Sequence, residues 1–292
     1  MIALDRALLE AMPLPDHEDD VDKDARGCVL AVGGSLEVPG GILLASVAAL
    51  RAGAGKLQIG TCRTLAPTLG LMVPEALVVA LPETPAGGID PSAIELLGDR
   101  IERCDAVVIG PGMSDAPAVA ELTRRLLAND GHAAILLDAA ALAGVEAAAD
   151  RIRARGGNVV LTPHHGEMAG LLGIDRARVA ANPEAIAADV AERFQCVVAL
   201  KCNETVVATP SGDVFRYGGG GIGLATSGSG DTLAGIIAGL LARGCDARQA
   251  TLWGVYLHGE AGRRLARSHG RIGFLARELL TEVPRVMGTF EA

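Results

Sequence analysis

The sequence has very few aromatic residues: phenylalanine, tryptophan and tyrosine together make up 2% of its 292 residues, although half of all residues are hydrophobic. The core must therefore be built from alanine, valine, leucine and isoleucine. This composition is typical of strands that are buried on both faces and covered by closely packed helices, as in parallel sheets. The length fits one large α/β domain or two modest ones.

The sequence also lacks a basic stripe, and its formal net charge is −9. This argues against a nucleic-acid partner, but it allows a small anionic ligand that is held by backbone N–H groups and one or two cations. No apolar run is long enough to span a bilayer, so we expect no membrane partner. Because the N-terminal segment is acidic rather than basic and then apolar, we expect no signal peptide and a cytoplasmic location.

The six cysteines form no C-x-x-C pair, and most of them lie in or beside apolar runs. This pattern favours buried thiols in a reducing cytoplasm over a metal site. The 38 glycines gather at the ends of apolar runs, which indicates turns and phosphate-binding loops rather than disorder.

Short apolar runs alternate with helix-like stretches, which predicts βαβ units and a mainly parallel sheet in a three-layer α/β/α sandwich. The predicted strands are 28–32, 57–60, 76–81, 106–109, 134–137, 159–161 and 197–200, with a hairpin of 204–209 and 213–217. The predicted helices include 40–51, 116–128, 184–193, 232–243, 247–267 and 273–280. Residues 1–24 are charged and contain two prolines, so we expect a surface arm followed by one domain over 25–292.

The strongest functional segment is the small-residue turn in 225–235, which ends in Asp231. Small residues let the backbone approach a ligand closely, and the amphipathic run that follows places the turn at a helix N-terminus. Unpaired N–H groups and the helix dipole favour phosphate there. Asp231 could instead be a helix N-cap, but the three small residues directly before it favour a functional carboxylate.

A second segment, 162–167, follows a predicted strand and contains two histidines and Glu167. Glu167 is placed to open the next helix and to order a divalent cation through water. We expect His165 to lie in a solvated loop, whereas His164 fits a loop or a ligand contact equally well. A histidine pair without a third ligand is a weak zinc signal.

Lys201 ends another predicted strand, where a phosphate or ribose contact is plausible for a cation. Weaker signals are the Gly110–Gly112 turn, Asp138 after its strand, and the glycine loop over 33–41. Parallel sheets bind ligands beyond the carboxyl ends of their strands, and all of these residues lie at such ends.

Taken in this order, the segments resemble the ribokinase-like superfamily and, within it, the NAD(P)H-hydrate dehydratases. The Gly-Ser-Gly-Asp-Thr-Leu-Ala-Gly block over 228–235 is similar to that family's G-[TS]-G-D-[VT]-L-A-G, and 162–167 is similar to its T-P-H-P-G-E. Residues 201–205 match K-G-x-x-T, 38–55 match a P-G-A helix that ends in R-A-G-A-G, and 253–262 match its Gly-V-Y-L-H-G-x-A-G helix. The resemblance covers residues 25 to 285.

The resemblance implies repair of hydrated NADH or NADPH at the expense of ADP, which yields AMP and phosphate. Asp231 is then the general base, and the N–H groups of Gly228, Ser229 and Gly230 form the anion hole. The implied nucleotide contacts are Lys201, Cys202, Asn203, Glu204, Thr205 and Gly230, and the implied contacts to the hydrated cofactor are Gly41, Gly112, His164 and Asp231. The resemblance also implies Mg²⁺, a homotetramer and an epimerase on a separate chain.

Three positions depart from the family pattern. Ala140 replaces the second carboxylate of D-A-D-A-L, Cys202 replaces a glycine after the lysine, and His165 replaces a proline. Two alternatives therefore stay open: an ATP-using ribokinase-like kinase of a vitamin precursor such as hydroxyethylthiazole, or a nucleotide-binding protein without catalysis. The sequence does not decide whether ADP or ATP is the phosphoryl donor, or whether hydrated NADH or hydrated NADPH is preferred.

Overall fold

The computed structural model describes residues 1–16 and 22–290, and its strands form one ten-stranded sheet in the order β1-β10-β9-β8-β7-β6-β5-β2-β3-β4. The strands are β1 (Ile2–Ala3), β2 (Cys28–Val32), β3 (Lys56–Cys62), β4 (Leu77–Leu81), β5 (Ala106–Ile109), β6 (Ala134–Leu137), β7 (Val159–Leu161), β8 (Val197–Leu200), β9 (Thr205–Ala208) and β10 (Val214–Tyr217). The α-helices are α1 (Arg6–Glu10), α2 (Pro39–Arg51), α3 (Ala66–Met72), α4 (Ile94–Glu102), α5 (Ala116–Leu127), α6 (Ala149–Ala154), α7 (His165–Leu172), α8 (Arg176–Ala181), α9 (Pro183–Phe194), α10 (Ser229–Ala242), α11 (Ala247–His269) and α12 (Ala276–Met287).

The sheet is mainly parallel, as the alternation of strands and helices predicts. From β8 to β4 every neighbouring pair is parallel, and β9 runs antiparallel to both β8 and β10. The hairpin of β9 and β10 confirms the antiparallel pair expected around residues 204–217. The sequence signal was strong because a strand buried on both faces is a nearly continuous apolar run.

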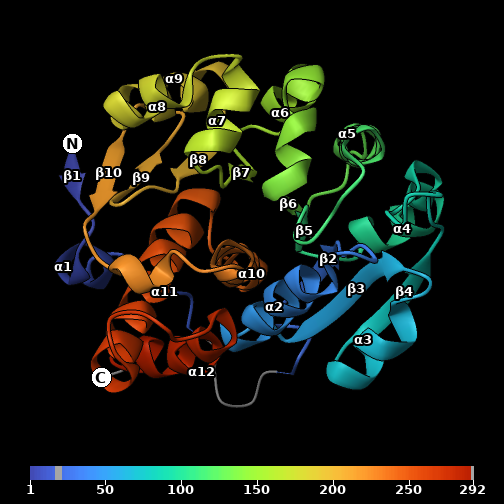
Figure 1. The fold of residues 1–292 in the computed structure, drawn as a ribbon, viewed down its shortest axis with the longest axis horizontal. Helices are drawn as coiled ribbons and strands as arrows, with labels where there is room; N and C mark the ends of the chain where they lie inside the picture. Colours follow the sequence, from blue (N-terminus) through green and yellow to red (C-terminus); the bar gives the residue numbers. More distant parts are fainter. Residues whose placement is uncertain (17–21, 291–292) are drawn as a thin grey trace.

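Helices cover both faces of the sheet, which confirms the three-layer sandwich (Figure 1). Alternate residues of β2 show how the two cores form: Val29 and Ala31 pack into the core beneath α2, α10 and α11, whereas Leu30 and Val32 pack into the core beneath α4, α5 and α9. All four side chains are fully buried. The six cysteines are free thiols, and five of them are buried, as expected.

The N-terminal segment is more than the surface arm that its charge and prolines suggested. Strand β1 adds to the sheet edge beside β10, with Ile2 paired to Phe215, and Leu4 and Leu9 are buried in the core that includes α10 and α11. The indole of Trp253 donates a hydrogen bond to the Met12 carbonyl at 2.8 Å. The charged residues of 1–24 hid these few apolar anchors, which hold the part up to residue 16 against the domain. The acidic stretch 17–21 lies outside the described residues.

The last helix is also longer than expected, because α12 continues to Met287 through Pro284. Val283 and Val286 pack into the core beside α10, and this burial outweighs the hydrogen bond that the proline removes. Among the described residues, no helix combines the length and the apolar character that a membrane crossing requires.

The order of the strands reverses between β2 and β5. The chain runs from β2 outward to β3 and β4, then returns to β5 on the other side of β2 and continues to β8. At such a switch point the connections leave the carboxyl ends of the two central strands in opposite directions and open a crevice for ligands. The loops after β2 and β5 approach each other there, since the Gly34 N–H donates to the Pro111 carbonyl at 2.9 Å.

Candidate active site

The small-residue turn over 225–235 forms the N-terminus of α10, as predicted. Gly228 is the N-cap residue, with a φ of 85° that glycine adopts without strain, and the helix begins at Ser229. Asp231 is therefore the third residue of the helix and not its cap. This excludes the structural alternative for Asp231 that the sequence left open.

The backbone N–H groups of this turn differ in their partners. The Ser229 N–H donates to the Thr226 carbonyl at 3.2 Å, whereas the hydrogen bonds of the described chain include none from the N–H of Gly228 or Gly230. Two unpaired donors at the positive end of a 14-residue helix are suited to an anion.

Gly41 lies directly against both Gly112 and Asp231, although the three residues are far apart in the sequence. A Cβ atom built on Gly41 would lie 2.5 Å from the Gly112 nitrogen and 3.1 Å from Oδ1 of Asp231. Only glycine fits at position 41, so the switch-point loops and the start of α10 meet without intervening side chains. The structure thus brings together three of the four residues expected to face the hydrated cofactor.

Burial of the Asp231 carboxylate raises its pKa to about 6, from an ordinary value of 3.8. This value includes the negative charge of Asp138, which also raises the pKa, and the ammonium of Lys201, which lowers it. A carboxylate with a pKa near 6 is mostly ionised at neutral pH, yet it is a better proton acceptor than an ordinary aspartate.

Lys201 connects the end of β8 to this carboxylate cluster. Its backbone N–H donates to the Pro163 carbonyl at 2.8 Å, and its ammonium lies 2.8 Å from Oδ1 of Asp138 and 3.8 Å from Oε2 of Glu167. The same ammonium would lie 3.2 Å from a Cβ atom on Gly230. Burial lowers the pKa of Lys201, but the neighbouring carboxylates outweigh burial and raise it, so the side chain is a fixed cation beside the α10 N-terminus.

His164 and Glu167 form a capping box at the start of α7. Nδ1 of His164 accepts hydrogen bonds from the N–H groups of Gly166 and Glu167 at 2.9 and 3.1 Å, and Oε2 of Glu167 accepts one from the His164 N–H at 2.7 Å. His164 is therefore structural in part, but its exposed ring also lines a cleft at the ends of the strands. His165 lines the cleft as well, where burial and nearby Arg176 lower its pKa.

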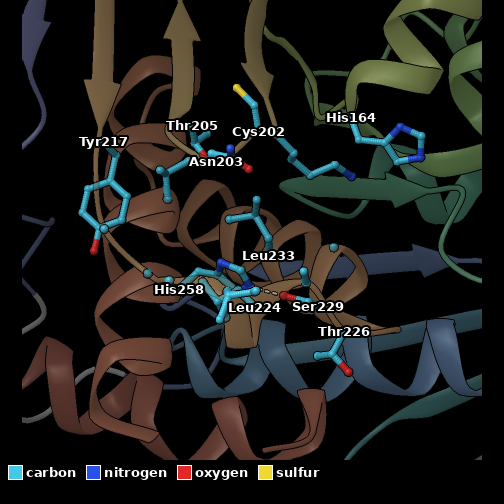
Figure 2. Close-up of a pocket in the computed structure, with 18 of the residues that line it drawn as sticks. His164, Cys202, Asn203, Thr205, Tyr217, Leu224, Thr226, Ser229, Leu233 and His258 are labelled. Atoms are coloured by element: carbon cyan, nitrogen blue, oxygen red, sulfur yellow. Dashed lines mark hydrogen bonds between the residues drawn. The ribbon is translucent and has the colours of Figure 1, made fainter. Parts of the chain in front are cut away.

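A cleft of about 760 Å³ opens between the strand ends and the helices α10 and α11 (Figure 2). Its lining residues are His164, His165, Arg176, Lys201, Cys202, Asn203, Thr205, Tyr217, Gly219, Gly221, Ile222, Leu224, Ala225, Thr226, Ser229, Gly230, Leu233, Val255, His258 and Gly259. Of the expected nucleotide contacts, only Glu204 is outside this set, and its carboxylate pairs with Arg216 at 3.0 Å. Asp231, Gly41 and Gly112 are not in the cleft lining, so their contact lies outside the cleft.

Known proteins resemble this chain over most of its length. The family model described as NAD(P)H-hydrate dehydratase matches residues 29–285. The chain belongs to the NAD(P)H-hydrate dehydratase family. An ADP-dependent (S)-NAD(P)H-hydrate dehydratase from Xanthomonas campestris is 48% identical to it over 282 residues, which cover 96% of this chain and 94% of the relative.

Solved structures of the family share the whole fold. The crystal structure of an ADP/ATP-dependent NAD(P)H-hydrate dehydratase from Bacillus subtilis, co-crystallised with ATP and Mg²⁺, is 30% identical, with a TM-score of 0.83 and coverage of 99% of this chain and 98% of that chain. A ribokinase-like superfamily protein from Enterococcus faecalis is 27% identical, with a TM-score of 0.80 and coverage of 99% and 96%. The expected ribokinase-like fold is confirmed.

Two departures from the family pattern lie close to these sites. The Cys202 thiol turns into its own loop and donates to the Glu204 carbonyl at 2.9 Å, and burial raises its pKa. Ala140 lies half-buried beside the core on the α5 side of the sheet. The remaining aspartate of that motif, Asp138, is 1% exposed and accepts a hydrogen bond from Oγ1 of Thr162 at 2.7 Å.

Sequence reasoning assigned no role to two cleft residues. Tyr217 donates a hydrogen bond to Oε1 of Glu260 at 2.8 Å, and Nε2 of His258 lies 3.0 Å from Oγ of Ser229. A histidine directly after the apolar stretch 252–257 was a signal for His258, but its partner is visible only once α11 packs against α10.

Proposed function

We propose that this chain dehydrates hydrated NADH or NADPH, and that conversion of ADP to AMP and phosphate drives the reaction. The observation that carries the proposal is the Asp231 carboxylate, with a pKa of about 6, which lies against Gly41 in a helix N-terminal turn that has unpaired amides. The membership of the chain in the NAD(P)H-hydrate dehydratase family supports the substrate class.

In this mechanism the hydrated nicotinamide ring occupies the crevice of Gly41 and Gly112, and the nucleotide occupies the cleft. Asp231 accepts the proton of the ring hydroxyl as the hydroxyl oxygen forms a bond to the terminal phosphorus of ADP. AMP leaves with the electron pair of the broken P–O bond. Phosphate then leaves the ring carbon with the C–O electron pair, and loss of a proton from the neighbouring carbon restores the double bond.

The residues around Asp231 stabilise the charge that moves in these steps. The free N–H groups of Gly228 and Gly230 are placed to hold the phosphoryl oxygens, and the Lys201 ammonium lies within reach of the same turn. Phosphoryl transfer depends mainly on such positioning and electrostatic stabilisation. We infer that Lys201, Cys202, Asn203 and Thr205, at the ends of β8 and β9, contact the AMP part.

We also infer that magnesium accompanies the nucleotide. Within residues 1–16 and 22–290 no group of three metal-ligating side chains occurs, and the Glu167 carboxylate already accepts a hydrogen bond from the His164 N–H. These residues fit a hydrated ion that is held by phosphate oxygens and contacts Glu167 through water, in keeping with the preference of Mg²⁺ for its hydration shell. The ion neutralises phosphate charge when it is bound.

The deciding experiment follows absorbance of the reduced nicotinamide band with purified protein, NADH hydrate and magnesium, and with ADP or ATP added in parallel. A rise that requires ADP is expected. A rise with ATP alone keeps the reaction but changes the donor. No rise with either nucleotide, with nucleotide binding intact, contradicts the proposal and favours a kinase or an inactive binding protein. Light scattering on the same sample tests the proposed homotetramer.

A further inference from the structure

His258 makes a hydrogen bond that the proposed mechanism does not use. It lies on α11, and its Nε2 atom is 3.0 Å from Oγ of Ser229, the first residue of α10 (Figure 2). Ser229 is 5% exposed, and both residues line the cleft. In the part of the chain that the structure describes, neither side chain hydrogen-bonds to any other side chain, and the His258 ring also interacts with the Ser229 backbone. The pair therefore forms a polar contact at the edge of the anion-binding turn.

The His258 ring is neutral at physiological pH. Burial lowers its pKa to about 4, and the nearby Lys201 charge lowers it too, against a hydrogen-bond interaction with the Ser229 backbone that raises it. A neutral imidazole carries one N–H, so Nε2 is either the donor to the serine oxygen or the acceptor from its hydroxyl.

A phosphoryl group at the turn distinguishes these two arrangements. If the serine donates to Nε2, its oxygen lone pairs are left for the anion, and the contact is repulsive. If Nε2–H donates to Oγ, the serine hydrogen is free to point at a phosphoryl oxygen. The Ser229 backbone N–H is already donated to Thr226, so the hydroxyl is the donor that this residue can supply.

We propose that His258 is a positioning residue, which donates from Nε2 to Oγ of Ser229 and so turns the Ser229 hydroxyl hydrogen toward the transferring phosphoryl group. This inference rests on the proposed function and deepens it. It adds a side-chain donor to the two free amides of Gly228 and Gly230, held in place from a second helix.

Two matched pairs of variants test the proposal through kinetics. His258→Gln keeps an N–H donor near the position of Nε2, whereas His258→Leu removes it at similar volume; Ser229→Thr keeps the hydroxyl, whereas Ser229→Ala removes it. We expect the Leu and Ala variants to lower kcat about 10- to 100-fold, with the KM for ADP within about threefold. The Gln and Thr variants should stay within about fivefold of the wild-type kcat. The combined Leu and Ala variant should be no slower than the slower single one, because both changes remove the same donor.

A purely structural histidine gives a different pattern. Equal losses in His258→Gln and His258→Leu, or losses that multiply in the combined variant, would overturn the proposal. So would a rise in the KM for ADP that accounts for the whole effect.

An independent readout requires no turnover. In protein labelled with ¹⁵N-histidine, the His258 signals are identified by their loss in His258→Gln, and their shifts report which ring nitrogen carries the proton. We expect the Nε2–H tautomer with ADP bound, and a neutral ring down to pH 5. A dominant Nδ1–H tautomer with ADP bound contradicts the proposal. If the wild-type protein does not dehydrate NADH hydrate, the proposed function fails, while the tautomer with ADP bound still decides the role of His258.

Discussion

The Lys201 ammonium lies 2.8 Å from Oδ1 of Asp138, and the two side chains are only 18% and 2% exposed. This ion pair borders Asp231 and acts on its pKa in opposite directions, since Asp138 raises it and Lys201 lowers it. The basicity of Asp231 is therefore set first by its burial at the start of α10, and then by residues that follow β6 and β8, the strands on either side of β7.

We expect the pH profile to report the pKa of Asp231. As the pH falls below about 6 the carboxylate gains a proton and can no longer accept one, so kcat/KM should fall about tenfold per pH unit. Initial rates between pH 5 and 8 measure this limb. As a control, ADP binding is measured over the same pH range, which separates the protonation of Asp231 from the protonation of ADP. A kcat/KM that stays constant down to pH 5 contradicts the role of Asp231 as the base.

Asp231→Asn should greatly lower turnover and yet stabilise the protein. The folded state raises this pKa from 3.8 to about 6, so the ionised form is disfavoured on folding. The cost is absent below pH 3.8, grows as the pH rises toward 6 and persists above it. Melting curves at pH 8 should therefore show a higher Tm for Asp231→Asn than for wild type, with a smaller difference near pH 4. ADP binding should be retained while kcat falls by several orders of magnitude.

Substitutions of Asp138 and Lys201 should shift the pH below which kcat/KM falls, and they should shift it in opposite directions. Asp138→Asn removes a negative charge beside Asp231 and should shift the limb to lower pH. Lys201→Met removes the positive charge and should shift it to higher pH.

Lys201→Met should also destabilise the protein by roughly 3–5 kcal/mol, because it leaves a buried carboxylate without its partner. Urea unfolding measures this loss of stability. The residual activity of each variant is sufficient to measure how its kcat/KM depends on pH. Shifts of both variants in the same direction would show that the pair does not act on Asp231 through charge.

Gly41 and Gly40 provide a matched pair at the start of α2. A Cβ atom on Gly41 would overlap the Gly112 nitrogen at 2.5 Å, whereas one on Gly40 meets no atom within 4 Å. Gly41→Ala should push the crevice loops apart and lower kcat/KM about 100-fold, since misplacement of about 1 Å has effects of this size. Gly40→Ala should keep wild-type activity and change stability by less than about 1 kcal/mol. Equal activities in the two variants would exclude the crevice as the substrate site.

Much of the fold could be predicted because its signals are local. The strands 28–32, 106–109, 134–137, 159–161 and 197–200 have the bounds that their apolar runs indicated. The start of α10 was likewise marked by its glycines. By contrast, the capping box at His164 escaped because histidine is not among the residues that usually cap helices.

The contacts that define the site depend on tertiary packing. Gly41, Gly112 and Asp231 come from three separate parts of the chain, and only the family resemblance connected them before the structure did. No sequence signal connected Ser229 with His258, because the pair forms only where α11 crosses the start of α10. The anchors Leu4 and Leu9 were missed for the same reason, since their partners lie more than two hundred residues away.

Pairing of β1 with β10 has a consequence for biosynthesis. Ile2 leaves the ribosome well before its partner Phe215, which is translated more than two hundred residues later. Until then β1 has no sheet to join, and afterwards the outer backbone of β10 stays open until β1 returns to it. An unpaired sheet edge is a template for association with other chains. A bulky fusion before Met1 that hinders this return should therefore lower the yield of dispersed protein more than the same fusion after Ala292.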